Sequence, residues 1–265
     1  MGRAIAAALL ASGVAALACW RRTLTLGGAM AATVVGAVVF LRGGLPAAGS
    51  LLAFFVSASA LSRIGQARKA SGSLAQAKGA RRDAWQVLAN GGWATVCIGL
   101  GQRHAFVGAL AAAGADTWAT EVGMLASRQP RLVTNLRPVP TGSSGGITPE
   151  GLAASLGGAL VVGLAWLLLG GDRRGMPVAA VAGACGSLVD SWLGATAQAL
   201  YRCRRCGMST EEARHRKCGQ PTELVRGQAW ITNDAVNAIS TLTGAAIGGL
   251  MPQKARRGGT RQGRG

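Results

Sequence analysis

The chain has 265 residues, of which 49% are hydrophobic and only 14% are charged, and its mean hydropathy is +0.30. Apolar runs long enough to cross a bilayer recur along its length, which excludes a soluble globular domain of this size. The formal net charge is +18, but the basic residues cluster in loops beside apolar runs and have no aromatic residues interleaved with them. This distribution argues against nucleic acid as a partner.

We predict an all-α, polytopic transmembrane helix bundle of about seven or eight spans, forming a single integral membrane domain over residues 1–252. Charge-free runs at 4–20, 23–41, 43–62, 84–102 and 151–171 each match the length that a membrane helix needs. Windows near 104–126, 175–200 and 228–251 are as long but are interrupted by acids. The abundant glycine and alanine fit close helix packing in lipid, although a compositional bias of the coding sequence explains them equally well.

The first apolar run, residues 4–20, has two interpretations. Its basic start and apolar core are typical of a signal peptide, and "ALAC" resembles a lipoprotein cleavage site. Arg21 and Arg22 follow at once, which is typical of the flank of a membrane span and favours a retained helix.

Most of the 28 basic residues fall in loops that follow odd-numbered spans, so the positive-inside rule predicts that these loops face the cytoplasm. We expect an integral membrane protein of a bacterial inner membrane, or of a plastid membrane. The basic tail, residues 253–265, is expected to be disordered. Eight spans would leave the tail outside, whereas a seven-span or re-entrant arrangement would bring it inside.

Acidic residues interrupt the later spans at matching depths. Asp116 lies ten residues from the basic end of its window, or about 15 Å along a helix, and Asp190 lies equally deep in window 175–200. Because the spans hold almost no Lys or Arg, a divalent cation is the simplest common partner for buried acids. We therefore predict Mg²⁺ at Asp116, Asp190, Glu121 and Asp234. The alternative is that each acid lies at a wet helix end and points to the headgroups.

Other polar residues fall in the same half of the membrane as these acids. The segments "AGADTWATEVG" and "CGSLVDSWLGATAQ" both place an aspartate before a hydroxyl residue and a tryptophan. This shared frame indicates an internal repeat, or a chance match in a chain rich in alanine and glycine. We expect polar support for the acids from Asn90, Thr117, Ser191, Gln198, Asn233 and Asn237.

The loop "LVTNLRPVPTGSSGGITPEG" joins the fifth and sixth windows. Its prolines stop any helix, and a flexible run of N–H groups and hydroxyls then precedes a helix start, which favours a phosphate cradle although no Walker A motif is present. A divalent cation, acidic residues and a phosphate-binding loop at one face of the membrane are typical of a site for phosphoryl transfer. The predicted phosphate-binding residues are Lys78, Arg81, Arg82, Thr141, Gly142, Ser143, Ser144, Gly145 and Gly146.

The loop "YRCRRCGMSTEEARHRKCG", within an expected cytoplasmic segment at 201–225, carries a different pattern. Cys203 and Cys206 form a Cys-x2-Cys pair, and His215 and Cys218 follow as His-x2-Cys. These are the ligand types of a structural zinc site, and a cytoplasmic location would keep the thiols reduced. The alternative is a set of loosely placed thiols.

Five ordered motifs, "KGARRDAWQVLANGG", "GADTWATEVG", "TGSSGGITPEG", "GSLVDSWLGATAQ" and "NDAVN", cover about residues 75–250. In this order they resemble a family of integral membrane proteins that includes plant phytyl-phosphate kinase and animal transmembrane protein nineteen. The family more often reads Ala-Ser-Glu at 119–121 and Thr-Asn or Thr-Val at 143–144, and these changes largely keep the hydroxyl and glycine chemistry. The resemblance implies transfer of a phosphoryl group from a nucleoside triphosphate, often CTP, to an isoprenoid monophosphate.

We therefore expect a membrane-embedded, Mg²⁺-dependent isoprenoid-phosphate kinase that acts in lipid metabolism on phytyl or another polyprenyl monophosphate. The four acids would form the catalytic centre and the basic residues would bind the phosphates of nucleotide and lipid. Two alternatives are an ion- or proton-coupled transporter that uses the same acids, and a CTP-dependent lipid cytidylyltransferase that releases pyrophosphate. A transporter would need polar residues reaching both membrane faces, whereas the outer half of these spans is almost purely apolar.

Overall fold

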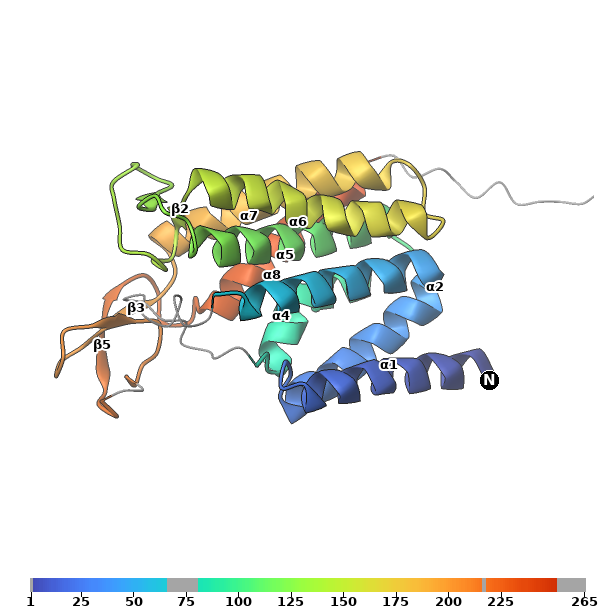
Figure 1. Cartoon of the computed structure of the whole chain (residues 1–265), viewed down its shortest axis with the longest axis horizontal. Helices are drawn as coiled ribbons and strands as arrows, with labels where there is room; N and C mark the ends of the chain where they lie inside the picture. The colour runs from blue at the N-terminus through green and yellow to red at the C-terminus, as the bar shows by residue number, and fades with distance from the viewer. Residues whose placement is uncertain (1, 66–80, 216–217, 252–265) are drawn as a thin grey trace, which may run out of the picture.

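The computed structural model describes residues 2–65, 81–215 and 218–251, and its described part contains seven α-helices (Figure 1). The predicted helical membrane bundle is confirmed. The helices are α1 Gly2–Trp20, α2 Leu26–Arg63, α4 Ala84–Gly99, α5 Arg103–Gly123, α6 Pro149–Leu168, α7 Gly175–Thr196 and α8 Asn233–Leu250.

Short strands, which the sequence pattern did not predict, form in the two long polar loops. They are β1 Arg131–Leu132, β2 Gly146–Ile147, β3 Leu200–Cys203, β4 Ser209–Thr210 and β5 Thr222–Arg226. The first two pair antiparallel, and the other three form an antiparallel sheet in the order β4-β3-β5. Figure 1 shows all of these strands at one end of the bundle, which we call the strand end.

Helix α2 contains both spans that the sequence predicts at 23–41 and 43–62. It bends at Gly44, whose backbone has a φ of 65° and a ψ of −157°, and Pro46 follows two residues later. Proline cannot donate to the preceding turn and clashes with it, so the helix breaks there. The two arms run in opposite directions, away from the strand end and back to it (Figure 1).

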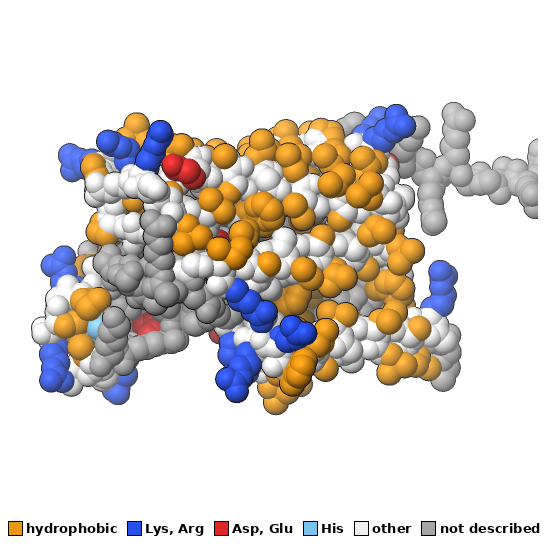
Figure 2. Space-filling view, in the orientation of Figure 1, with side chains coloured by type: hydrophobic (Ala, Val, Ile, Leu, Met, Phe, Trp, Pro, Cys, Tyr) orange, Lys and Arg blue, Asp and Glu red, His pale blue; other side chains and the backbone are white. Residues whose placement is uncertain are grey.

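Four described helices, α1, α2, α6 and α7, are long and apolar enough to cross a membrane by length and composition alone. This number is lower than the seven or eight spans predicted. Helix α4 has only 16 residues, and α5 and α8 contain several of the polar residues that the sequence analysis singled out. Hydrophobic side chains nevertheless cover much of the helical flank, and blue basic side chains gather near its ends (Figure 2).

Helix α5 is the centre of the bundle. All twelve residues from His104 to Ala115 are buried, and the helix packs against α2, α4, α6, α7 and α8. A helix surrounded on every side needs no amphipathic stripe, because each of its faces is covered by another helix. Asp116 follows this buried stretch directly, on the side of α5 nearer the strand end.

Glycine allows the neighbours of α5 to approach its backbone. A Cβ atom on Gly244 of α8 would collide with the carbonyl oxygen of Gly108, and one on Gly158 of α6 would collide with that of Gly114. Small residues at such crossings let helices pack closely where lipid supplies no hydrophobic driving force. Buried hydroxyls join helices as well: Ser240 donates to the backbone oxygen of Gly186, and Thr241 to that of Ala89, each at 2.9 Å.

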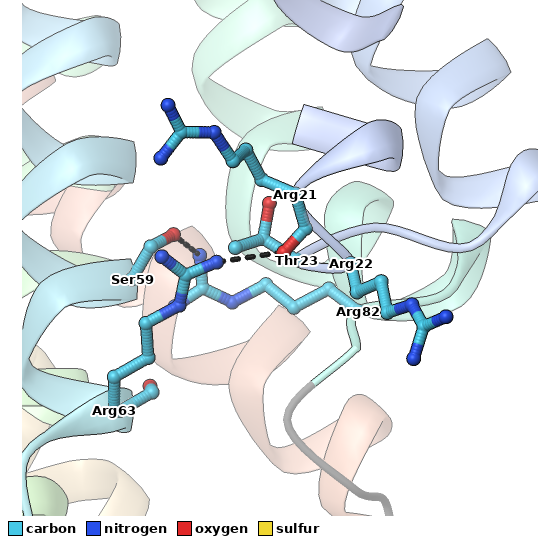
Figure 3. Close-up of a pocket in the computed structure, with 7 residues that line it drawn as sticks. Arg21, Arg22, Thr23, Ser59, Arg63 and Arg82 are labelled. Atoms are coloured by element: carbon cyan, nitrogen blue, oxygen red, sulfur yellow. Dashed lines mark hydrogen bonds between the residues drawn. The ribbon is translucent and has the colours of Figure 1, made fainter. Parts of the chain in front are cut away.

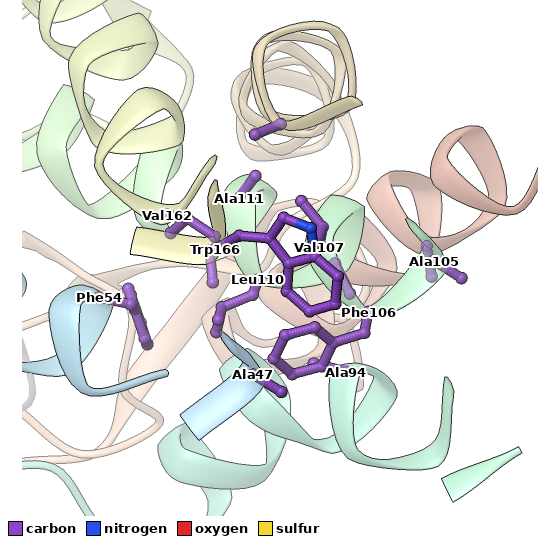
Figure 4. Packing of buried hydrophobic residues seen from close by; sticks show 14 of the residues in the cluster. Ala47, Phe54, Ala94, Ala105, Phe106, Val107, Leu110, Ala111, Val162 and Trp166 are labelled. Atoms are coloured by element: carbon purple, nitrogen blue, oxygen red, sulfur yellow. The ribbon is translucent and has the colours of Figure 1, made fainter. Parts of the chain in front are cut away.

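An apolar core fills the bundle on the side of α5 away from the strand end. Phe106 and Trp166 pack with ring centroids 6.1 Å apart, and Val107 and Leu110 lie beside them (Figure 4). All four side chains are fully buried. Beyond this core, Nε2 of the buried His104 donates to the carboxylate of Asp172, 2.9 Å from Oδ1. Partial burial alone would raise the pKa of Asp172, but the hydrogen bond from His104 lowers it overall.

The crossing of α5 and α8 generates a stability prediction. Gly244→Ala should lower the melting temperature of the detergent-solubilised chain by several degrees, because overpacking against backbone costs about 1–3 kcal/mol. Gly92→Ala in α4 is the matched control, since no atom lies within 4 Å of the added Cβ. There the higher helix propensity of alanine should leave the melting temperature unchanged or slightly raised. Equal melting curves for the two variants would contradict the close crossing.

Candidate functional site

A cavity of about 750 Å³ opens at the strand end of the bundle. Its wall comes from the C-terminal halves of α5 and α7, the first turns of α4, α6 and α8, and the two polar loops. These segments are far apart in the sequence. They meet because α5 and α7 end, and α4, α6 and α8 begin, at this same end of the bundle.

The cavity gathers most of the negative charge of a strongly basic protein. Six of the ten acidic residues line it, whereas Arg82 is the basic residue among the described residues of its wall. The six are Asp116, Glu121, Asp190, Glu211, Glu212 and Asp234. So many carboxylates in one enclosed wall repel one another unless cations or protons stand between them.

The side chains of Asp116 and Asp190 lie close enough for the two carboxyl groups to interact. The equal depths of these residues in parallel helices α5 and α7 predicted this meeting. Among the described residues, no hydrogen-bond donor reaches the buried Oδ2 atom of Asp190. Two neighbouring carboxylates with an unsatisfied buried oxygen have the chemistry of a site for a divalent cation, whose preferred ligands are carboxylate oxygens.

Glu211, which the sequence analysis did not single out, joins this pair from the loop after β4. Its Oε1 atom accepts hydrogen bonds from Oγ of Ser144 at 2.5 Å and from Nε2 of Gln198 at 2.7 Å. Burial raises the pKa of Glu211 despite these bonds, and the charge of Asp234 raises it further. Glu211 also lies within electrostatic range of Asp190, so the acids of α7, α8 and the loop form one cluster.

Glu121 lies apart from this cluster. Its Oε1 atom accepts a hydrogen bond from Ser62 on α2 at 2.5 Å, and its charge acts on Arg82. Burial lowers the pKa of Arg82, and Glu121 opposes that effect. An arginine remains charged under such shifts, so the positive charge of Arg82 attracts the negative charge of Glu121 at one edge of the cavity.

The glycine-rich loop supplies part of the cavity wall, but only part of the predicted cradle. The N–H groups of Ser143 and Gly146 donate to local turn oxygens, and the hydroxyl of Ser144 donates to Glu211. Gly145 has a φ of 81°, and a Cβ there would collide with Ala195 at the end of α7. The glycine thus lets the loop lie directly on α7 and bring Ser144 to the acids.

Two of the helices that begin at the cavity, α6 and α8, favour anions there. Thr148 caps α6 by accepting from the N–H of Gly151 at 3.0 Å, and Thr232 caps α8 by accepting from that of Ala235 at 3.4 Å. Both caps line the cavity. The positive ends of these helix dipoles suit phosphate oxygens, in the same space where the acids suit a cation.

The structure brings most of the sequence-predicted residues to this cavity. Thr141 is not among the residues of its wall, and Arg81 instead donates to the backbone oxygen of Leu24 at 3.3 Å. Lys78 lies outside the described residues. The predicted residues in the wall are Arg82, Asn90, Asp116, Thr117, Glu121, Gly142, Ser143, Ser144, Gly145, Gly146, Asp190, Ser191, Gln198, Asn233, Asp234 and Asn237.

A second, smaller pocket of about 320 Å³ adjoins the cavity, since Ser62 and Arg82 line both. Arg21, Arg22 and Arg63 complete its basic wall (Figure 3), and no acidic residue is among the described residues that line it. Arg63 donates to the backbone oxygen of Arg21 at 2.7 Å, and Arg82 to Ser59 at 3.4 Å. Figure 3 shows the guanidinium groups of Arg63 and Arg82 close together, whereas those of Arg21 and Arg22 point away from them. Two guanidinium groups at one point favour a multiply charged anion such as a phosphate group.

The predicted metal-ligand loop also forms a compact group. The ligand atoms of Cys203, Cys206, His215 and Cys218 all lie within 4.8 Å of one another, outside the cavity. The same loop supplies Glu211 to the cavity, and that connection was not evident from the spacing of its cysteines.

A helical bundle with an apolar flank and an acid-lined cavity at one end defines this chain as a polytopic integral membrane protein. Its residues 9–245 match the family model described as "Integral membrane protein DUF92", and the chain belongs to that family. No solved structure matches it.

Relatives occur in plants, archaea and cyanobacteria. The chain is 31% identical to Protein PGR of Arabidopsis thaliana over 276 aligned residues, covering 91% of this chain and 93% of that protein. It is 29% identical to an uncharacterized membrane protein of Methanocaldococcus jannaschii, with 87% and 86% covered. It is 27% identical to an uncharacterized membrane protein of Synechocystis, with 86% and 82% covered.

The acid pair generates a binding prediction. Asp190→Asn should weaken binding of Mn²⁺, used as a paramagnetic probe for Mg²⁺, on the order of tenfold or more in detergent solution. Because this change also removes repulsion between two carboxylates, the metal-free variant should melt no lower than the parent chain.

Glu223→Gln is the matched control for this measurement, because Glu223 is an exposed acid on β5 that pairs with Arg204 outside the cavity. Its Mn²⁺ affinity should equal that of the parent. Unchanged affinity in both Asp116→Asn and Asp190→Asn would show that the pair does not bind the cation.

Proposed function

We propose that this protein is a membrane-embedded phosphotransferase that uses a divalent cation and a nucleoside triphosphate to convert an isoprenoid monophosphate into its diphosphate. The observation that carries the proposal is the proximity of Asp116 and Asp190 in a cavity that adjoins a pocket lined by arginines. The resemblance of five ordered motifs to a family that includes phytyl-phosphate kinase supports the substrate class.

The residues divide the work of binding two anions. Asp116 and Asp190, with Glu211 and Asp234 beside them, would hold Mg²⁺, which when bound neutralises the charge of the nucleotide phosphates. The first turns of α6 and α8 present helix dipoles to phosphate oxygens. Arg63 and Arg82, whose guanidinium groups lie together (Figure 3), would hold the phosphate of the lipid acceptor beside the nucleotide.

The proposed reaction needs no strong base. An oxygen of the isoprenoid monophosphate attacks the γ-phosphorus of the nucleoside triphosphate, a new P–O bond forms, and the bond to the bridging oxygen breaks to release the nucleoside diphosphate. The acceptor phosphate is already ionised, so the reaction requires no proton transfer. Positioning and charge neutralisation therefore supply most of the catalysis, which matches a cavity without a histidine among its described wall residues.

The packing of the bundle favours an enzyme over a transporter. Between the cavity and the His104–Asp172 pair, α5 carries a fully buried apolar stretch that includes Phe106 and Leu110. A transporter that used the same acids would need a second polar pathway through this core. A site that is accessible from one end suits a phosphotransferase acting on a lipid headgroup.

The activity test uses the purified chain with Mg²⁺, radiolabelled CTP or ATP, and phytyl or geranylgeranyl phosphate. We expect the isoprenoid diphosphate as product. Asp116→Asn should lower kcat on the order of 100-fold or more because a group that neutralises transition-state charge is lost. Glu223→Gln should leave kcat unchanged.

The arginine pocket is tested in the same assay. Arg63→Gln should raise KM for the lipid phosphate more than it lowers kcat, because it removes a charge that binds the acceptor. A CDP-linked lipid with released pyrophosphate would identify a cytidylyltransferase instead. The absence of any product, or full activity in Asp116→Asn, would overturn the proposal.

A further inference from the structure

The loop that follows α7 contains two turns closed by the same pair of backbone hydrogen bonds. In the first, the N–H of Gly207 donates to the oxygen of Cys203 at 2.8 Å, and the N–H of Cys203 donates to the oxygen of Met208 at 2.9 Å. In the second, the N–H of Gly219 donates to the backbone oxygen of His215 at 2.8 Å, and the N–H of His215 donates to the backbone oxygen of Gln220 at 2.9 Å. Both glycines have a positive φ, 71° and 65°, which closes the turn.

Each turn carries a pair of ligand residues at its first and fourth positions. Cys203 and Cys206 occupy these positions in the first turn, and His215 and Cys218 in the second. The Sγ atom of Cys206 lies 3.5 Å from Nδ1 of His215, across the space between the turns. The four candidate ligand atoms lie within 4.8 Å of one another, which fits a tetrahedral four-ligand site.

The sheet that joins the two turns is small, with Cys203 of β3 paired to Thr222 of β5. Strands β3, β4 and β5 form a small sheet in which Leu224 and Val225 are exposed, while Cys203 and His215 are buried. A segment of this size buries too little apolar surface to fix its own conformation and needs a cross-link or a metal. A disulfide would use two of the three thiols and leave the histidine without a role.

We infer that Cys203, Cys206, His215 and Cys218 bind one Zn²⁺ ion, and that this ion holds Glu211 in position in the acid-lined cavity. Four protein ligands fill the coordination sphere, so the ion is structural and takes no part in the reaction. Glu211 lies between the two turns, directly after β4, and its side chain reaches Ser144 and Gln198. Fixing both turns therefore restricts the path of the segment that presents this acid.

The zinc content of the full-length chain tests the first half of the inference. Protein purified in detergent without chelators should contain about one Zn²⁺ per chain. Cys206→Ser should reduce this content to background, and it is the preferred variant because Cys206 is the exposed ligand. Cys97→Ser in α4 is the matched control and should retain the metal. A parent chain without zinc, or zinc unchanged in Cys206→Ser, would overturn the site.

Replacement of the metal by Co²⁺ keeps the test informative if a variant fails to fold. The parent chain should show the visible absorption of tetrahedral cobalt with thiolate ligands, and spectra of octahedral cobalt would contradict the ligand set. Trypsin provides a second measurement, since the loop contains Arg204 and Arg205. Chelation should accelerate cleavage there and added Zn²⁺ should reverse the effect.

The link to the cavity is tested by binding alone. Removing zinc from the parent chain should weaken Mn²⁺ binding, whereas in Glu211→Gln the same removal should have no further effect, because the acid that the loop positions is already lost. Equal weakening in both backgrounds would break the link. None of these measurements uses turnover, so their failure is distinguishable from failure of the proposed phosphotransferase activity.

Discussion

The proximity of Asp116 and Asp190 is the constraint on which the proposed site depends. Two carboxylates in a helical membrane protein repel each other and lose most of their hydration, and both effects disfavour the folded state. They are tolerable only where a cation or proton lies between them and where the rest of the protein fixes the two helices rigidly. The cavity that opens at the strand end gives a cation or proton access to the two acids. The packing of α5 holds the two helices rigidly.

The position of α5 explains why glycine is so frequent at the crossings. Five helices pack around one, and the carbonyl oxygens of Gly108 and Gly114 lie where a larger neighbour would place its Cβ. This close packing leaves the apolar half of α5 sealed around Phe106 and Trp166. The polar half therefore opens in one direction only, towards the loops that carry Ser144 and Glu211. The same arrangement that buries the centre of the bundle limits the acid-lined cavity to one end.

Part of the site could be predicted because helices fix depth. Asp116 and Asp190 lie equally far along parallel helices, and a constant rise of 1.5 Å per residue makes such residues meet if the helices are neighbours. Depth along a helix also predicted that Asn90 near the start of α4, and Asn233 and Asn237 near the start of α8, lie at the depth of the cavity. The two arms of α2 could also be predicted, because each is a separate apolar run in the sequence. The structure joins the two runs in one helix that bends at Gly44.

Other parts have no periodic signal. Glu211 and Ser144 belong to loops whose paths depend on turns and on contacts with the end of α7, so sequence spacing does not place them. The strands are two to five residues long, too short for an alternating pattern to stand out. Ser62 and Arg63 lie at the end of an apolar helix and line the arginine pocket only because α2 reverses direction. Arg81, adjacent to Arg82, turns to Leu24 instead of the cavity, a distinction that sequence proximity cannot make.

The most direct test of the central claim is the position of a divalent cation in an experimental structure. Crystals of the chain grown with Mn²⁺ should show an anomalous density peak within coordination distance, about 2.0–2.2 Å, of carboxylate oxygens from both Asp116 and Asp190. A peak bound by only one of the two acids, or aspartate side chains that face different surfaces of the bundle, would contradict the account.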